Sequence, residues 1–139
     1  MNEVKFKIFA TNWINVFGVF AAIYLSVVVN ELIDQRTTGS KDFFSTFFLA
    51  GFYLVIYYGF VLLGFIPAIF ILDMLLLDKR RKLLYHKLII EWVIISIPFF
   101  YIFIKEDGGW ILLVGIAAFL ITQMLRGKAI IKNLQQISN

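Results

Sequence analysis

The stretch LDMLLLDKRRKLLYHKLIIEW, residues 72–92, decides how the rest of the chain must fold. A cluster of basic residues separates two strongly apolar segments, and one acid, Asp73 or Glu91, lies within each segment. The hydrocarbon core of a bilayer disfavours a run of cationic side chains, whereas a membrane surface with anionic headgroups attracts it. The stretch therefore indicates a short loop at a membrane surface between two spanning helices.

The composition of the whole chain supports a membrane environment. Of the 139 residues, 61% are hydrophobic and only 16% are charged, and the mean hydropathy is +0.88. Soluble domains contain about 25% charged residues, and a chain of this size buries only a modest part of its surface on folding. A bilayer is therefore the medium that accommodates this much apolar surface. The chain has no cysteine, which excludes disulfides, thiolate catalysis and zinc–thiolate or iron–sulfur sites.

Four apolar segments are long enough to cross a bilayer as helices. They cover residues 8–29, 43–77, 83–104 and 110–125, and they lack the apolar–polar alternation of membrane barrel strands. Only short polar breaks separate them, so we expect one domain over residues 1–139. The predicted fold is an all-α integral membrane protein with four transmembrane helices in an up-down bundle. The second segment would extend about 52 Å against a core of about 30 Å, and we expect it to tilt or to kink near Pro67.

The basic residues predict the orientation of this bundle. Ten of the 13 Lys and Arg residues fall on one side of the predicted topology. These are Lys5, Lys7, Lys79, Arg80, Arg81, Lys82, Lys87, Arg126, Lys128 and Lys132. Because basic loops stay in the cytoplasm, we expect both termini to be cytoplasmic, in a bacterial inner (plasma) membrane. The central basic residues are expected to contact anionic lipid headgroups, and they are Lys79, Arg80, Arg81, Lys82 and Lys87.

Polar residues within the apolar segments are candidate functional residues, because ionisable groups are costly inside a bilayer. The alternating topology places such residues of all four helices at a similar depth near the inner leaflet. This predicted polar layer consists of Asn12, Asn15, Asp73, Glu91 and Gln123. It would serve as a hydrogen-bonded clamp, a proton-linked site or a docking point for a partner. The plainer alternative is that Asp73 is solvated, that Glu91 pairs with Lys87 or His86, and that helix ends are simply polar.

Small residues indicate where helices approach one another, since close packing drives helix association in lipid. Gly18, Ala22 and Ser26 recur at four-residue spacing in the first segment, and Gly51 and Gly59 share a face of the second. In the fourth segment, Gly115 is the small residue at which a neighbouring helix is expected to approach. The pattern favours packing within the bundle and also fits contact with another subunit.

The sequence lacks the residues that several common kinds of functional site require. His86 is the only histidine, so neither a zinc site nor bis-histidine haem ligation is expected. The chain also lacks a phosphate-binding glycine loop and a basic face interleaved with aromatic residues. We therefore expect a non-enzymatic protein with no metal, no cofactor and no nucleic-acid partner.

The leading functional hypothesis is a small integral membrane subunit or accessory protein. It would act by helix packing with copies of itself or with another membrane protein, and membrane lipids would surround it. The alternative is an oligomeric channel, pore-former or ion-coupled carrier that uses Glu91 and Asp73. The size also fits a small immunity or defence membrane protein, and the sequence does not separate these classes.

Overall fold

The computed structural model describes residues 3–38, 43–76, 83–105 and 110–137. Side chains are described in these ranges except at residues 3–5, 35–38, 43, 57, 58, 60, 62, 136 and 137. Nearly all described residues lie in five helices, which confirms the prediction of an all-helical chain. They are α1 (Glu3–Ala10), α2 (Asn12–Thr38), α3 (Phe43–Leu76), α4 (Leu84–Lys105) and α5 (Trp110–Ile137).

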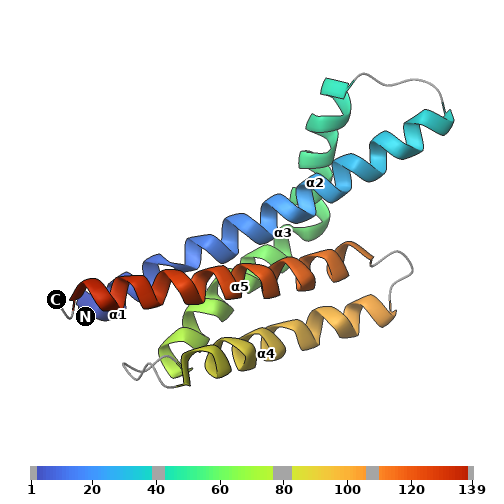
Figure 1. Cartoon of the computed structure of the whole chain (residues 1–139). Coiled ribbons are helices and arrows are strands. Elements are labelled where there is room, and N and C mark those ends of the chain that lie inside the picture. The colour runs from blue at the N-terminus through green and yellow to red at the C-terminus, as the bar shows by residue number, and fades with distance from the viewer. Residues whose placement is uncertain (1–2, 39–42, 77–82, 106–109, 138–139) are drawn as a thin grey trace.

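The four long helices, α2 to α5, run in alternating directions along the chain (Figure 1). α5 has its most extensive contacts with α2 and α4, and α3 packs on the same two helices. The short α1 packs on α5 and α2. Both ends of the chain lie at the same end of the molecule, beside the start of α2 and the end of α5.

Helical backbone extends beyond two of the four apolar segments. The first segment was expected to cover residues 8–29, but helical backbone begins at Glu3, is interrupted at Thr11 and continues to Thr38. The fourth was expected to end at residue 125, but α5 continues to Ile137. Apolarity shows how much of a helix suits lipid and not where its backbone ends, so helices that continue into polar surroundings are underestimated.

The interruption at Thr11 is a turn that joins α1 to α2. The backbone N–H of Thr11 donates to the carbonyl oxygen of Ile8 at 3.0 Å, and the Thr11 hydroxyl donates to the same oxygen at 2.6 Å. The N–H of Ile14 then donates to the carbonyl of Thr11 at 3.1 Å. The turn leaves the Thr11 and Asn12 side chains buried at the first residues of the long helix.

Buried apolar side chains form two clusters. The larger one occupies the middle of the bundle, where the rings of Phe65 and Phe119 meet edge to face with centroids 5.0 Å apart. The smaller one joins α1, α4 and the last part of α5 through Ile8, Leu84, Leu88 and Ile130. Ile130 is fully buried, which explains physically why α5 extends past its predicted end.

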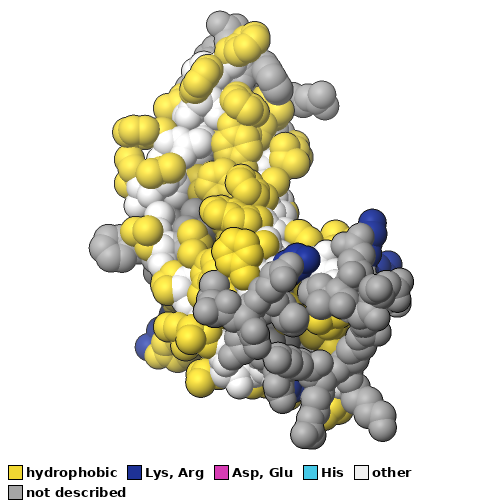
Figure 2. All heavy atoms as spheres, turned by 90° about the vertical axis from the view of Figure 1, so that its left-hand side faces the viewer, with side chains coloured by type: hydrophobic (Ala, Val, Ile, Leu, Met, Phe, Trp, Pro, Cys, Tyr) yellow, Lys and Arg dark blue, Asp and Glu magenta, His cyan; other side chains and the backbone are white. Residues whose placement is uncertain are grey.

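The polarity of the molecule is inverted relative to a soluble domain. Phe48 is 73% exposed and Leu75 is 75% exposed, whereas Arg126, Glu91 and Asn15 are 0% exposed. Viewed from the end that carries both termini, hydrophobic side chains cover the upper part, and Lys and Arg side chains gather in the lower part (Figure 2). An apolar exterior around buried polar groups is the arrangement that lipid requires.

Three stretches of described residues are long and apolar enough to cross a membrane: Phe6–Asp34, Leu84–Lys105 and Trp110–Gln135. The described side chains of α3 provide two shorter apolar stretches, Phe44–Ile56 and Leu63–Leu76. The chain is thus an all-helical protein whose helices are consistent with a membrane location.

Glycines mark close contacts of α5 with its neighbours. A Cβ atom at Gly18 of α2 would lie 2.3 Å from the Cγ2 atom of Thr122, and one at Gly115 would lie 3.1 Å from the Ile23 side chain. Gly127, which the sequence analysis did not single out, lies against Tyr85 of α4, 2.8 Å from the corresponding Cβ position. These contacts lie within the molecule rather than on its outer surface.

The remaining small residues have different surroundings. Ala22 packs against the larger apolar cluster, and the Ser26 hydroxyl donates to the Ala22 carbonyl at 2.8 Å. Gly51 lies against the Tyr24 ring, 3.4 Å from the position of a Cβ atom. Among the described residues, none lies within 4 Å of the corresponding position at Gly59. Gly59 therefore marks no helix contact in the described part of the molecule.

Candidate functional site

A cluster of polar side chains is buried where α2, α3, α4 and α5 meet the turn at Thr11. Its centre is Arg126 of α5, which is fully buried despite its charge. We call this group the Arg126 cluster, and it consists of Thr11, Asn12, Asp73, Glu91, Gln123 and Arg126. Because an unpaired buried charge is very costly, the partners of Arg126 decide whether these helices can associate.

The guanidinium of Arg126 binds an acid on each of two other helices. Its Nη2 atom lies 2.5 Å from Oδ2 of Asp73 on α3. Its Nη1 atom lies 3.4 Å from both carboxylate oxygens of Glu91 on α4. Asp73 is therefore the close ion-pair partner, and Glu91 is the more loosely held one.

Three uncharged side chains complete the cluster. Nε of Arg126 donates to the Thr11 hydroxyl at 3.1 Å, and Nη1 lies 3.4 Å from Oε1 of Gln123. The Asn12 amide nitrogen donates to the Asp73 oxygen that also binds Arg126. The cluster thus joins all four long helices through side-chain interactions.

Helix geometry explains how these residues reach one place. Gln123 and Arg126 are three residues apart on α5 and so share a face. Asn12 begins α2, where the turn at Thr11 brings both side chains to the same point. Asp73 lies in the last turn of α3, and Glu91 lies in the first half of α4. The alternating helix directions then bring the end of one helix beside the start of the next.

The charges in the cluster do not balance if every group is ionised. Asp73 and Glu91 carry two negative charges and Arg126 carries one positive charge, and all three side chains are at most 2% exposed. Low-dielectric surroundings disfavour a residual charge, because solvent does not screen it. The surplus of one acid is the main electrostatic feature of the site.

Several buried polar atoms in this region have no hydrogen-bond partner among the described residues. They are Oδ1 of Asn12, Oδ1 of Asp73, Nε2 of Gln123 and both amide atoms of Asn15. Asn15 follows Asn12 by three residues, so the two share a face of α2. Buried polar atoms are normally hydrogen-bonded, so these atoms are unused hydrogen-bonding and ligating capacity inside the described part of the molecule.

The structure brings four residues of the predicted polar layer into direct contact with Arg126 or with each other: Asn12, Asp73, Glu91 and Gln123. Asn15 is fully buried on the same face of α2 but makes no hydrogen bond in the described part of the chain. Two alternatives raised from the sequence do not match this geometry. Asp73 is buried rather than solvated, and the ion-pair partner of Glu91 is Arg126 rather than Lys87.

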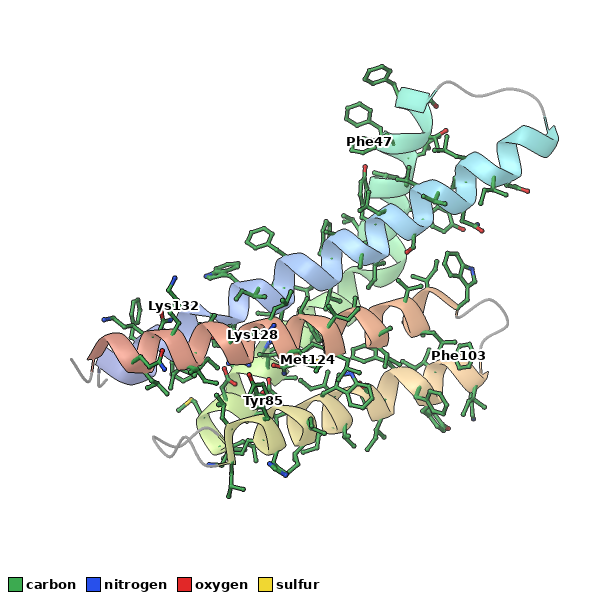
Figure 3. The ribbon with its side chains drawn as sticks, in the orientation of Figure 1. Phe47, Tyr85, Phe103, Met124, Lys128 and Lys132 are labelled. Carbon is green, nitrogen blue, oxygen red and sulfur yellow. The ribbon has the colours of Figure 1, made fainter. Side chains whose placement is uncertain are left out.

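Sequence reasoning missed Arg126 as a site residue. The sequence pattern groups it with Lys128 and Lys132 among the basic residues that follow the fourth apolar segment on the cytoplasmic side. Both lysines are exposed, and they lie on the same helix as Arg126, toward the end of the molecule with both termini (Figure 3). The available signal was Ile130 and Leu134, which continue the apolar pattern beyond Arg126 and imply that α5 does not end there.

The predicted anionic-lipid contacts lie mostly outside the described residues. Lys79, Arg80, Arg81 and Lys82 fall in the range that the structure does not describe. Lys87 is partly buried near the start of α4, at the level of the smaller apolar cluster.

The described residues contain no group of three or more His, Cys, Asp or Glu side chains that could hold a metal ion. The Arg126 cluster offers two carboxylates and three uncharged oxygen-bearing side chains in one buried place. Such a group can hold helices in register, or bind a proton or a hard cation.

Comparison with family models, with curated proteins and with solved structures finds no match for this chain.

Proposed function

We propose that this protein is a non-enzymatic integral membrane subunit or accessory protein that acts by helix packing within a membrane complex. The observation that carries the proposal is the first half of α3, which extends past α4 and α5 and leaves an aromatic face uncovered (Figure 1). Phe48 is 73% exposed and Phe52 is 68% exposed on this face. Aromatic side chains are enriched at protein interfaces, where they bury large areas.

This part of α3 is held by α2. The Tyr24 hydroxyl of α2 donates to the Phe47 carbonyl at 2.8 Å, and the two rings meet edge to face with centroids 5.0 Å apart. Gly51 lies beside the Tyr24 ring, where an added Cβ would make an ordinary contact at 3.4 Å. The contact orders one side of the helix and positions Phe48, Phe52 and Val55 for a partner helix, which would be a second copy or another membrane protein.

The absence of native cysteine makes the interface directly testable. Single cysteines are placed by Phe52→Cys on the exposed α3 face and by Ile97→Cys on α4, where the side chain is 62% exposed. Oxidation or a bifunctional thiol reagent is then applied in native membranes. We expect a cross-linked product from Phe52→Cys and much less from Ile97→Cys. Equal yields at both positions, or a monomer with no cross-link at Phe52→Cys, would contradict the proposed interface.

We infer further that α3 also crosses the membrane, which brings the number of transmembrane helices to four. Its 34 residues would extend about 51 Å, which exceeds a hydrocarbon core of about 30 Å. A bend near Pro67 would accommodate the surplus. The α3 ribbon changes direction along its length (Figure 1). The basic residues then favour cytoplasmic termini in a bacterial inner membrane.

A second candidate function is an ion-coupled carrier or channel, and the surplus acid of the Arg126 cluster favours it. Two carboxylates around one guanidinium are the kind of group that changes its charge during transport. The test is proton or cation flux in reconstituted vesicles, with Glu91→Gln compared with the exposed control Glu31→Gln. Flux that Glu91→Gln abolishes and Glu31→Gln preserves supports a carrier. A wild-type protein without flux removes this candidate and leaves the subunit proposal unaffected.

A further inference from the structure

The Arg126 cluster has one more buried acid than base, and two of its buried oxygen atoms, Oδ1 of Asn12 and Oδ1 of Asp73, have no hydrogen-bond partner among the described residues. We propose that it is a binding site for one monovalent cation, either a small alkali ion or a proton, enclosed by α2, α3 and α4. The site deepens the second candidate function, because it would be the coupling site of a carrier. It does not require transport, since a bound cation would equally stabilise a membrane subunit.

The ligand atoms come from two helices that face each other. Oδ1 of Asp73 is the free oxygen of a carboxylate whose other oxygen is occupied by Asn12 and Arg126. The Asn12 nitrogen donates to Asp73, so its oxygen points away from that bond and is free. Asn15 adds a fully buried amide one turn further along α2. Carboxylate and amide oxygens are the ligands that hard cations prefer.

The charge of the cluster indicates the charge of the ligand. A single positive charge neutralises two carboxylates and one guanidinium, whereas a divalent ion would leave one positive charge buried. Buried uncompensated charge is costly in either sign. A proton shared between Asp73 and Glu91 would meet the same requirement, so the ligand is defined here by its charge of one.

Among the described side chains, Arg126 is the base that pairs with Asp73 and Glu91. α2 carries no charged residue between Asn12 and Asn30, and α3 carries none between Phe43 and Leu72. On α4, His86 is exposed and Lys87 is partly buried, and the described salt bridge of Glu91 is with Arg126. On α5, Lys128 is exposed, and Lys7 of α1 is partly buried. Arg126 forms salt bridges with both Asp73 and Glu91.

The experiment measures thermal unfolding of the whole chain, purified in mild detergent. The midpoint Tm is followed at pH 8 in NaCl, LiCl, KCl or choline chloride at constant ionic strength, and then in choline chloride as the pH is lowered. We expect Na⁺ or Li⁺, or protons in choline, to raise the Tm of wild type by about 3–6 °C in a saturable manner. Glu31→Gln, which removes an exposed acid of α2, should respond as wild type does.

Glu91→Gln removes the surplus acid and leaves the Asp73–Arg126 pair. We expect the half-saturating cation concentration to rise more than about tenfold, because one of the attracting charges is gone. Asp73→Asn is the second variant in case Glu91→Gln does not fold, and it should weaken binding by a similar factor.

The arms of the experiment distinguish the cation. Dependence on Na⁺ or Li⁺ supports an alkali ion, and dependence on pH alone supports a proton. A wild-type Tm that responds to neither overturns the proposal. A response that persists unchanged in Glu91→Gln places the cation elsewhere and also overturns it. Both results concern the cation site alone, and the α3 interface is tested separately by cross-linking.

Discussion

At the scale of single residues, Arg126 determines how the polar interior is organised. Its guanidinium reaches Asp73 at 2.5 Å, Glu91 at 3.4 Å and the Thr11 hydroxyl at 3.1 Å. Arginine suits this role because its planar group offers several donors at once and stays charged. Removing it would leave two acids facing each other without water, which is more costly than the pairing itself is favourable.

We predict that Arg126→Gln destabilises the protein by about 3–5 kcal/mol, because it leaves two buried carboxylates uncompensated. Chemical or thermal unfolding in detergent measures the change in the free energy of unfolding. Lys128→Gln is the matched control, since Lys128 is exposed on the same helix and two residues away. Equal stability of the two variants would show that Arg126 does not pair with the two acids in the purified protein.

At the scale of helices, the most extensive contact is between α2 and α5. Gly18 leaves space for the Thr122 methyl group, and Gly115 leaves space for the Ile23 side chain. Small residues are effective in lipid because they let helix backbones approach and gain packing contacts. The contact also places Asn12 and Arg126, which lie further along the same pair of helices, within one polar cluster.

We predict that Gly18→Ala destabilises the protein by about 1–3 kcal/mol through overpacking. The new Cβ would meet the Cγ2 atom of Thr122, which lies 2.3 Å from its position. Thr122→Ser removes that methyl group and keeps the hydroxyl that donates to the Phe119 carbonyl, so the double variant should recover most of the loss. Unfolding of the single and double variants measures the coupling between the two positions.

Gly59→Ala serves as the control for this pair. Among the described residues nothing lies within 4 Å of its added Cβ, so we expect no loss of stability. A loss as large as that of Gly18→Ala would mean that both effects come from the helix backbone rather than from packing.

At the scale of the whole molecule, the two ends of the bundle differ in charge. Lys128 and Lys132 lie toward the end that carries both termini, whereas Phe47 and Phe103 lie toward the other end (Figure 3). Because the long helices alternate in direction, residues near the start of α2 and the end of α5 share one side. The start of α2 and the end of α5 must therefore lie on the same side of a membrane.

We predict that cysteines at Phe6 and Lys132 label alike and that a cysteine at Glu31 behaves oppositely. All three positions are exposed, and Glu31 lies near the far end of α2. An impermeant maleimide should reach Glu31→Cys in intact cells, whereas Phe6→Cys and Lys132→Cys should react only after lysis, because basic ends stay cytoplasmic. The reverse pattern would invert the orientation, and different labelling of Phe6→Cys and Lys132→Cys would contradict the helix arrangement itself.

Local sequence patterns accounted for the helical class of the chain and for the approximate position of each long helix. Apolarity over about 20 residues is a property of a segment by itself, so it is readable without a partner. The same local reasoning underestimated α2 and α5, because a helix can continue beyond its apolar stretch, and at the end of α5 packing on other helices supports the continuation. Ile130 illustrates this, since its burial depends on Ile8, Leu84 and Leu88 from two other helices.

The sequence by itself determined that Asp73 and Glu91 interrupt apolar segments and that they fall at a similar depth. Only the tertiary structure decided that Arg126 joins them, that Asn12 shares an Asp73 oxygen, and that Asn15 has no partner among the described residues. The physical reason is that an ion pair depends on the register and rotation of one helix against another. Those quantities come from contacts such as Gly18 with Thr122, between residues far apart in the chain.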